Sequence, residues 1–180
     1  MRIIGGKLQG VHIDTANVPS VRPTTNRAKE ALFNILANYY DFELLVVLDL
    51  FAGAGNVGFE FASRGCRAVV MVEKNRQVVR SLLRFVRRYQ LDNVEVWLAS
   101  AERFVKESAD GYDIIFMDPP YQFRHYTSMI LRILNGELLR PGGRLIVEHH
   151  HKWGGVDHPY FEQSRRYGQT VFSFFKRPLK

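Results

Sequence analysis

Short apolar runs alternate with amphipathic segments along most of the chain. The apolar runs predict strands at residues 46–50, 68–73, 94–98, 112–117 and 143–148, and a further strand within 165–176. Apolar residues at helical spacing predict helices at 27–38, 56–64, 75–90, 101–108 and 125–139. Strands that alternate with helices are typical of a parallel sheet with helices on both faces. The pattern therefore predicts an α/β fold. Before the first helix, residues 3–8 and 11–13 predict a short hairpin, and residues 14–25 predict an extended loop.

Polar side chains stand at or just after the ends of four predicted strands. They are Asp49, Glu73, Ser100 and Asp118. Because ligands of such sheets bind outside the carboxyl ends of the strands, we expect these side chains to gather at one edge. Each residue taken alone fits a strand-end cap or a turn. All four together favour a binding site.

A glycine-rich turn follows the strand at 46–50. It contains Gly53, Gly55 and Gly58 in the pattern G-x-G-x-x-G, which permits a tight turn, close approach to a ligand and close packing of the next helix. The pattern fits a dinucleotide equally well, and Glu73 suits the ribose hydroxyls of either ligand. Asp49 argues against a dinucleotide, because its negative charge would face the pyrophosphate of that ligand. S-adenosylmethionine carries no phosphate and offers an ammonium and a sulfonium, so the sequence favours this ligand.

The motif Asp118-Pro119-Pro120-Tyr121 closes the strand at 112–117. The prolines fix φ and lack an N–H group, so the chain leaves the strand stiffly and nearby carbonyls are available as acceptors. A carboxylate and a carbonyl that each accept one N–H group would hold a planar exocyclic amine, and Tyr121 would stack on its ring. The alternative is a strand-end turn with an aromatic plug. In the context of the glycine-rich turn, the motif favours methyl transfer to nitrogen.

Composition favours one compact domain with a polyanionic partner. The chain has 180 residues, of which 46% are hydrophobic, and this suffices for one core over 1–180, with an extension at 1–40 and a catalytic core at 41–180. Its net charge of +7 favours nucleic acid as a partner. No apolar run approaches the ~20 residues of a membrane span, and the start lacks the apolar region of a signal peptide. We therefore expect a cytoplasmic protein with no membrane partner.

The histidines and the cysteine do not form a metal-binding pattern. His149, His150 and His151 are consecutive, so in an extended segment they point to alternate sides and do not easily converge on one ion. The single cysteine, Cys66, cannot form an internal disulfide and is expected to be a small packing residue. We therefore expect no metal.

Four segments in order resemble the RsmD family of bacterial small-subunit ribosomal RNA guanine-N2 methyltransferases, which belong to the class I S-adenosylmethionine-dependent methyltransferases. They are residues 2–6, 22–34, 49–58 and 118–121, and the resemblance covers nearly the whole chain. It implies a Rossmann-like, mostly parallel seven-stranded sheet with helices on both faces and an antiparallel last strand. A small N-terminal hairpin and helix would precede this sheet.

The resemblance also implies roles for individual residues. The acceptor base would be held at the catalytic motif Asp118, Pro119, Pro120 and Tyr121. The methyl donor would be held by Asp49, Phe51, Ala52, Gly53, Gly55, Gly58, Glu73, Lys74, Ser100 and Ala101. Where the family commonly places Asp or Asn to meet the adenine amine, this chain has Ser100, a shorter acceptor.

A second set of residues is predicted to contact RNA. It comprises Arg22, Thr24, Thr25, Arg27, Glu30 and Asn34, at the start and on the polar side of the helix at 27–38. Cationic and hydroxyl side chains suit phosphates, and the amino end of a helix favours an anion. The alternative is an N-cap at Thr24 or Thr25 with a solvated helix surface.

The sequence thus predicts methylation of the N2 amine of a guanine in 16S ribosomal RNA, either free or within a partly assembled small ribosomal subunit. An N6-adenine or N4-cytosine nucleic-acid methyltransferase would use the same amine chemistry. A DNA enzyme of that kind would be expected to carry a separate base-recognition domain, for which this chain is short. A basic RNA-binding module with a degenerate donor site is the alternative that is not an enzyme.

Overall fold

The computed structural model describes residues 1–15, 25–120 and 122–179. Within these ranges, one sheet contains β1 (Val46–Asp49), β2 (Ala68–Glu73), β3 (Val94–Leu98), β4 (Tyr112–Met117), β5 (Leu139–His150), β6 (Phe161–Tyr167) and β7 (Thr170–Lys176). The helices are α1 (Asn26–Ala37), the 3-10 turn η1 (Phe42–Leu44), α2 (Gly58–Ser63), α3 (Arg76–Arg88), α4 (Ala101–Glu107) and α5 (Tyr126–Asn135). None of the helices in the described part of the chain is long and apolar enough to span a bilayer.

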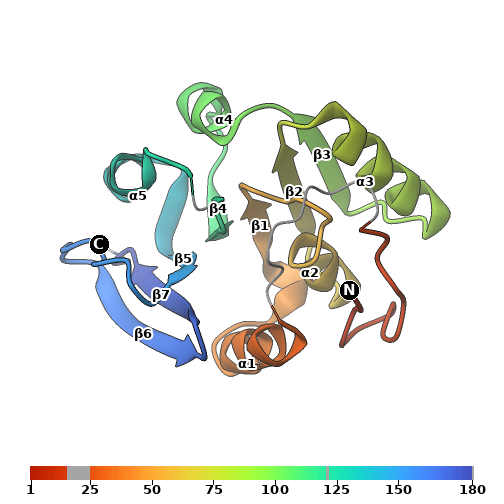
Figure 1. Cartoon of the computed structure of the whole chain (residues 1–180), viewed down its shortest axis with the longest axis horizontal. Coiled ribbons are helices and arrows are strands. Elements are labelled where there is room, and N and C mark those ends of the chain that lie inside the picture. The colour runs from red at the N-terminus through yellow and green to blue at the C-terminus, as the bar shows by residue number, and fades with distance from the viewer. Residues whose placement is uncertain (16–24, 121, 180) are drawn as a thin grey trace.

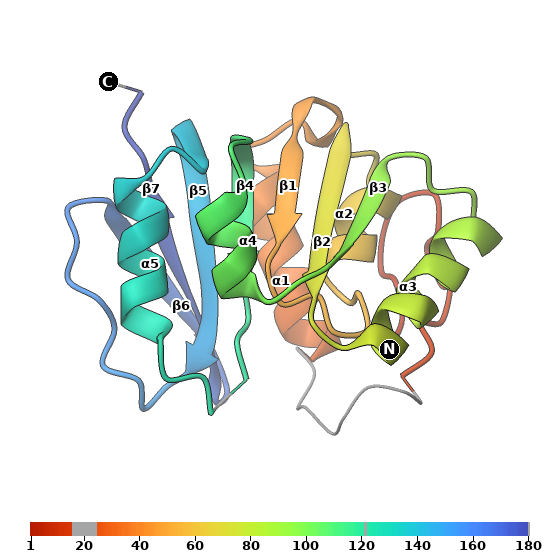
Figure 2. The same ribbon diagram turned by 90° about the horizontal axis from the view of Figure 1, so that it is seen from above.

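The strand order is β3-β2-β1-β4-β5-β7-β6 (Figure 1). Strands β1 to β5 pair in parallel, whereas β7 lies antiparallel between β5 and β6. The predicted parallel sheet with an antiparallel last strand is confirmed. Helices α1, α2 and α3 cover one face of the sheet, and α4 and α5 cover the other (Figure 2).

Two predicted boundaries at the carboxyl end were wrong. The single strand predicted within 165–176 is the end of β6 and the whole of β7, joined by a turn in which Gly168 has a φ of +66°. The helix predicted at 125–139 ends at Asn135. A side chain at the next residue, Gly136, would lie 2.8 Å from the Arg132 carbonyl oxygen, so glycine suits this helix end.

Two further expectations need correction. The predicted N-terminal hairpin forms no strands; it is a single antiparallel bridge between Arg2 and His12, in which the Ile3 N–H group donates to the Val11 carbonyl at 2.9 Å. Strand β5 begins four residues before the predicted 143. Gly142 has a φ of +78°, a left-handed backbone conformation that glycine adopts readily. The pairing of β5 with β4 therefore continues on both sides of this irregularity.

Alternate residues of the central strands enter two different apolar clusters. On β4, Ile114 and Phe116 pack with α1, α2 and α3, whereas Ile115 and Met117 pack with α4 and α5. This period of two is the one expected of strands buried on both faces. The same alternation determines which face of the sheet the side chains just after each strand end point toward.

A buried ion pair joins the N-terminal segment to the sheet domain. Lys29 of α1 lies 3.2 Å from Glu60 of α2, and both side chains are fully buried. The Lys29 ammonium also donates to the Arg2 carbonyl at 2.8 Å and to Asn56 Oδ1 at 2.9 Å. Glu60 accepts from the Ile4 N–H group at 2.9 Å. Burial lowers the pKa of Lys29, and Glu60 opposes this shift.

Replacing Lys29 with alanine should lower the free energy of unfolding by about 3–5 kcal/mol, because it leaves the Glu60 charge buried without its partner. Arg103→Ala is the matched control, since Arg103 and Glu107 form an ion pair whose side chains are 70% and 58% exposed. This control should cost less than about 1 kcal/mol. Urea unfolding measures both. Equal losses in the two variants would contradict the role given to Lys29.

Candidate active site

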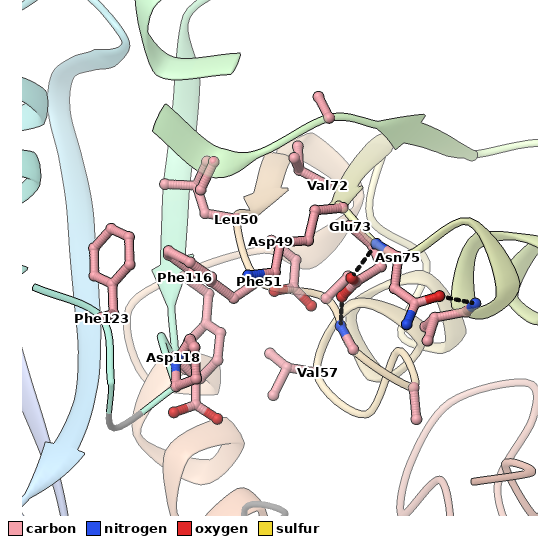
Figure 3. Close-up of a pocket in the computed structure, with 18 of the residues that line it drawn as sticks. Asp49, Leu50, Phe51, Val57, Val72, Glu73, Asn75, Phe116, Asp118 and Phe123 are labelled. Atoms are coloured by element: carbon pink, nitrogen blue, oxygen red, sulfur yellow. Dashed lines mark hydrogen bonds between the residues drawn. The ribbon is translucent and has the colours of Figure 1, made fainter. Parts of the chain in front are cut away.

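A cleft of about 620 Å³ opens at the carboxyl ends of β1, β2 and β4. In Figure 3, Asp118 and Phe123 lie at one side, Glu73 and Asn75 at the other, and Asp49 between them. The predicted residues that line the cleft are Asp49, Phe51, Ala52, Gly53, Glu73, Lys74, Ala101, Asp118 and Pro120. The structure therefore brings together three of the four polar strand-end residues.

Asp49 ends β1 and is 2% exposed. Its Oδ2 accepts a hydrogen bond from the Gly58 N–H group at 3.0 Å, whereas its buried Oδ1 has no hydrogen-bond partner among the described residues. Burial raises the pKa of Asp49 to about 7, although the Gly58 N–H group opposes the shift. This buried oxygen is therefore an acceptor position that remains open to a hydrogen-bond donor.

Glu73 ends β2 and holds two segments that line the cleft, the glycine-rich turn and the loop before α3. One of its oxygens accepts from the Gly53 N–H group at 3.1 Å, and the other accepts from the Asn75 N–H group at 2.7 Å. Asn75 in turn caps α3 by accepting from the Gln77 N–H group at 2.9 Å, so a chain of hydrogen bonds runs from the glycine-rich turn to α3 (Figure 3). A carboxylate has about four acceptor positions, so Glu73 retains capacity for hydroxyl groups.

Gly55 and Gly58 do not line the cleft but make the turn beside it possible. Gly55 has a φ of +85°, and a side chain there would lie 2.4 Å from the Phe59 ring. A side chain on Gly58 would lie 2.9 Å from Met71 of β2. Gly58 therefore lets α2 pack closely on the sheet, as its position in the motif predicts.

Ser100 does not line the cleft either. Its hydroxyl caps α4 by accepting from the Arg103 N–H group at 3.2 Å. Two residues on, Glu102 lines the cleft beside Ala101. The acceptor that the structure offers at this strand end is therefore a carboxylate in the first turn of the helix.

Asp118 lies at the end of β4, partly buried and beside the other carboxylates. Burial raises the pKa of Asp118 well above its ordinary value, and the charges of Glu148 and Asp49 raise it further. The prediction that the proline carbonyls are available was wrong for Pro120, which accepts from the Phe123 N–H group at 2.8 Å because the chain turns back there. The Pro119 carbonyl accepts no backbone hydrogen bond within the described ranges.

The predicted stacking residue, Tyr121, lies outside the described residues. An aromatic ring at this side of the cleft comes from Phe123, whose centroid is 5.2 Å from that of Phe51 in an edge-on arrangement. Sequence reasoning missed Phe123, although its place two residues after the motif could have indicated it. Val57, Asn75, Val78, Glu102 and Phe116 also line the cleft and were missed.

The residues predicted to contact RNA are only partly described. Arg22 and Thr24 lie outside the described residues. Thr25 caps α1 by accepting from the Ala28 N–H group at 3.2 Å. The side chains of Arg27, Glu30 and Asn34 are exposed on α1. The structure thus places these three on the outer surface of the helix.

Comparison with known proteins identifies the family. The chain matches the family described as Conserved hypothetical protein 95 over residues 1–176. It is 32% identical to the Ribosomal RNA small subunit methyltransferase D of Haemophilus influenzae, covering 82% of this chain and 78% of that protein. The protein of the same name from Buchnera aphidicola is 31% identical, covering 83% of this chain and 78% of that protein. The chain belongs to this RsmD-like family of methyltransferases.

Solved structures agree with the family and confirm the predicted fold class. The yhhF protein of Escherichia coli has a TM-score of 0.87 at 27% identity, covering 100% of this chain and 99% of that chain. A hypothetical protein of Thermus thermophilus has a TM-score of 0.84 at 34% identity, covering 97% and 98%. An RNA methyltransferase of Salinibacter ruber, solved with S-adenosyl-L-homocysteine, shares the fold at 14% identity and a TM-score of 0.66, covering 88% and 95%. This methyltransferase has the class I fold.

The raised pKa of Asp49 should make stability depend on pH. Its pKa is about 7 in the folded protein and about 3.8 when unfolded, so the folded state binds the extra proton between these values. Asp49 therefore lowers the free energy of unfolding by about 1.4 kcal/mol for each unit of rising pH in this window, with no further loss above it. Asp49→Asn should remove that part of the slope in urea unfolding at several pH values. Parallel curves for both proteins would contradict the assignment.

Proposed function

We propose that this methyltransferase transfers a methyl group from S-adenosylmethionine to the N2 amine of a guanine in 16S ribosomal RNA, either free or in a partly assembled small subunit. The observation that carries the proposal is the gathering of Asp49, Glu73 and Asp118 around one cleft. The relatives named Ribosomal RNA small subunit methyltransferase D support an RNA of the small subunit as substrate. The net charge of +7 supports a polyanionic partner.

We assign Asp49 and Glu73 to the methyl donor. The unpartnered Oδ1 of Asp49 suits the donor's ammonium, and the remaining acceptor positions of Glu73 suit its ribose hydroxyls. We also assign Glu102, which lines the cleft, instead of Ser100 to accept from the adenine amine. When bound, the donor supplies an electrophilic methyl group on a sulfonium whose positive charge is neutralised by the transfer. The residues around it hold this group in place, and such positioning can supply several kcal/mol.

We assign Asp118 and the Pro119 carbonyl to the acceptor amine. The lone pair of this amine is delocalised into the purine ring, and two acceptors that each take one N–H group increase the nucleophilicity of the nitrogen. Proline fixes φ at Pro119, so its carbonyl is held stiffly. Transfer forms the N–C bond and breaks the C–S bond. The methylated, cationic nitrogen then loses a proton readily, so Asp118 orients the amine more than it acts as a general base.

We assign the outer surface of α1 to the RNA. Lys29 in the first turns of this helix contacts Asn56, which lines the cleft, so the amino end of α1 lies near the site. Exposed Arg27 suits a phosphate there. The dipole of α1 also favours the negative charge of a phosphate at its amino end. Arg22 and Thr24 remain predicted parts of this surface, whereas the Thr25 hydroxyl caps the helix.

A strain that lacks this protein should lose one N2-methylguanosine from its 16S ribosomal RNA, and the wild-type gene should restore it. The Asp118→Ala gene should not restore it, because the amine loses an acceptor, while the purified variant binds the donor within a few-fold of wild type. Asp92→Ala, an exposed carboxylate at the other end of the sheet, is the control and should restore the nucleoside fully. Nucleoside mass spectrometry and calorimetry provide the measurements.

Other outcomes of this experiment separate the alternatives. Loss of N6-methyladenosine or N4-methylcytosine would assign the same amine chemistry to a different base. An unchanged set of methylated nucleosides would favour a basic RNA-binding module. Full restoration by Asp118→Ala would contradict the role of Asp118 while leaving the substrate open.

Arg27→Ala should weaken binding to 16S ribosomal RNA and reduce the dependence of log affinity on log salt by about one unit, because one phosphate contact is lost. Donor affinity and thermal stability should hardly change. Arg67→Ala provides the matched control, since Arg67 is exposed just before β2, at the end of the sheet opposite the cleft. Filter binding at several salt concentrations measures both. If both variants kept the wild-type slope, the surface of α1 would be a solvated face.

A further inference from the structure

Glu148 lies beside Asp118 on the side away from the donor residues. The sheet order places β4 between β1 and β5, with β2 beyond β1 (Figure 2). The donor residues Asp49 and Glu73 end β1 and β2, so they occupy one side of Asp118. An acceptor base that reaches Asp118 without displacing the donor therefore lies over the ends of β4 and β5.

The strand register makes Glu148 the direct neighbour of Asp118. Phe116 pairs with Ile146, and Met117 pairs with Val147, in parallel strands. Phe116 and Ile146 enter the apolar cluster on the α1 face, whereas Met117 and Val147 enter the cluster on the opposite face. Continuing the alternation by one residue places the next pair, Asp118 and Glu148, on the α1 face.

Two neighbouring carboxylates in this position repel each other. Glu148 is only 6% exposed, and its charge is one of the causes that raise the pKa of Asp118. A ligand that presents two adjacent N–H groups would relieve this repulsion, because each carboxylate would accept one of them. Guanine presents such an edge, with its N1–H group next to its N2 amine.

We propose that Glu148 makes the acceptor site specific for guanine, by accepting the N1–H group while Asp118 accepts from the N2 amine. This inference rests on the proposed function and adds the residue that selects the base. In adenine and cytosine, the ring nitrogen next to the exocyclic amine has no hydrogen and is itself an acceptor. A carboxylate facing that nitrogen repels it, so the same contact that favours guanine excludes the other two amines.

The test uses small-subunit RNA in which the methylated guanine is replaced by 2-aminopurine. This base keeps the exocyclic amine, but its N1 carries no hydrogen. Wild-type protein should methylate the guanine RNA with a kcat/KM about 10- to 100-fold higher, the effect of one hydrogen bond to a charged group. Equal kcat/KM values of the wild-type protein for guanine RNA and for 2-aminopurine RNA would overturn the proposal.

The Glu148→Gln variant then assigns the preference to this residue. An amide can donate to N1 of 2-aminopurine, so the preference for guanine should fall by at least about tenfold while donor affinity stays unchanged. Glu148→Asp keeps the charge and should keep the preference. Glu162→Gln is the control for lost stability alone, because Glu162 pairs with Arg144 near the other end of β5. Its preference for guanine should equal that of wild type.

The outcomes distinguish this inference from the proposed function. An unchanged preference in folded Glu148→Gln would overturn the role of Glu148 and leave guanine methylation standing. RNA with inosine at the same position lacks the N2 amine and should not be methylated. Methylation of the inosine RNA, or no methylation of guanine RNA by wild type, would overturn the proposed function itself.

Discussion

The parallel pairing of β1 with both β2 and β4 is the constraint on which the site depends. Because the three strands run in one direction, their carboxyl ends meet at one edge and bring Asp49, Glu73 and Asp118 around the same cleft. These residues are separated by 69 positions between the first and the last. Neither a helix nor a loop of this chain could gather them. The parallel register of β4 and β5 places Glu148 next to Asp118.

The gathering of carboxylates has an energetic cost that shapes the chemistry of the site. Burial raises the pKa of both Asp49 and Asp118, so each charge is disfavoured in the folded protein. Cationic or N–H donor groups of ligands would restore those charges, which couples ligand binding to the charge state of the site. Glu73 differs from both, because two backbone N–H groups already hold it and the turn at Gly53 depends on it.

The N-terminal segment is tied to the cleft by buried polar contacts as well as by apolar packing. Lys29 links the Arg2 carbonyl, Asn56 of the glycine-rich turn and Glu60 of α2. Such a network is costly to break, since removing any member would leave a buried polar group without its partner. It explains how a segment with almost no secondary structure keeps a defined position, with Met1 at the wall of the cleft.

Local pattern in the sequence was sufficient to locate the strands β1 to β5, apart from the early start of β5. It was also sufficient to predict their parallel pairing and to place Asp49, Glu73 and Asp118 at strand ends. Period and glycine spacing are properties of neighbouring residues, so they can be read along the chain. Tertiary structure decided what depends on contacts between distant segments. In the folded chain, the Ser100 hydroxyl caps α4, whereas Glu102 lines the cleft. The Pro120 carbonyl accepts a hydrogen bond within a turn, and Lys29 is buried against Glu60. Each outcome depends on which polar groups lie close enough to form a hydrogen bond or ion pair with one another. The folded chain alone brings these distant groups together.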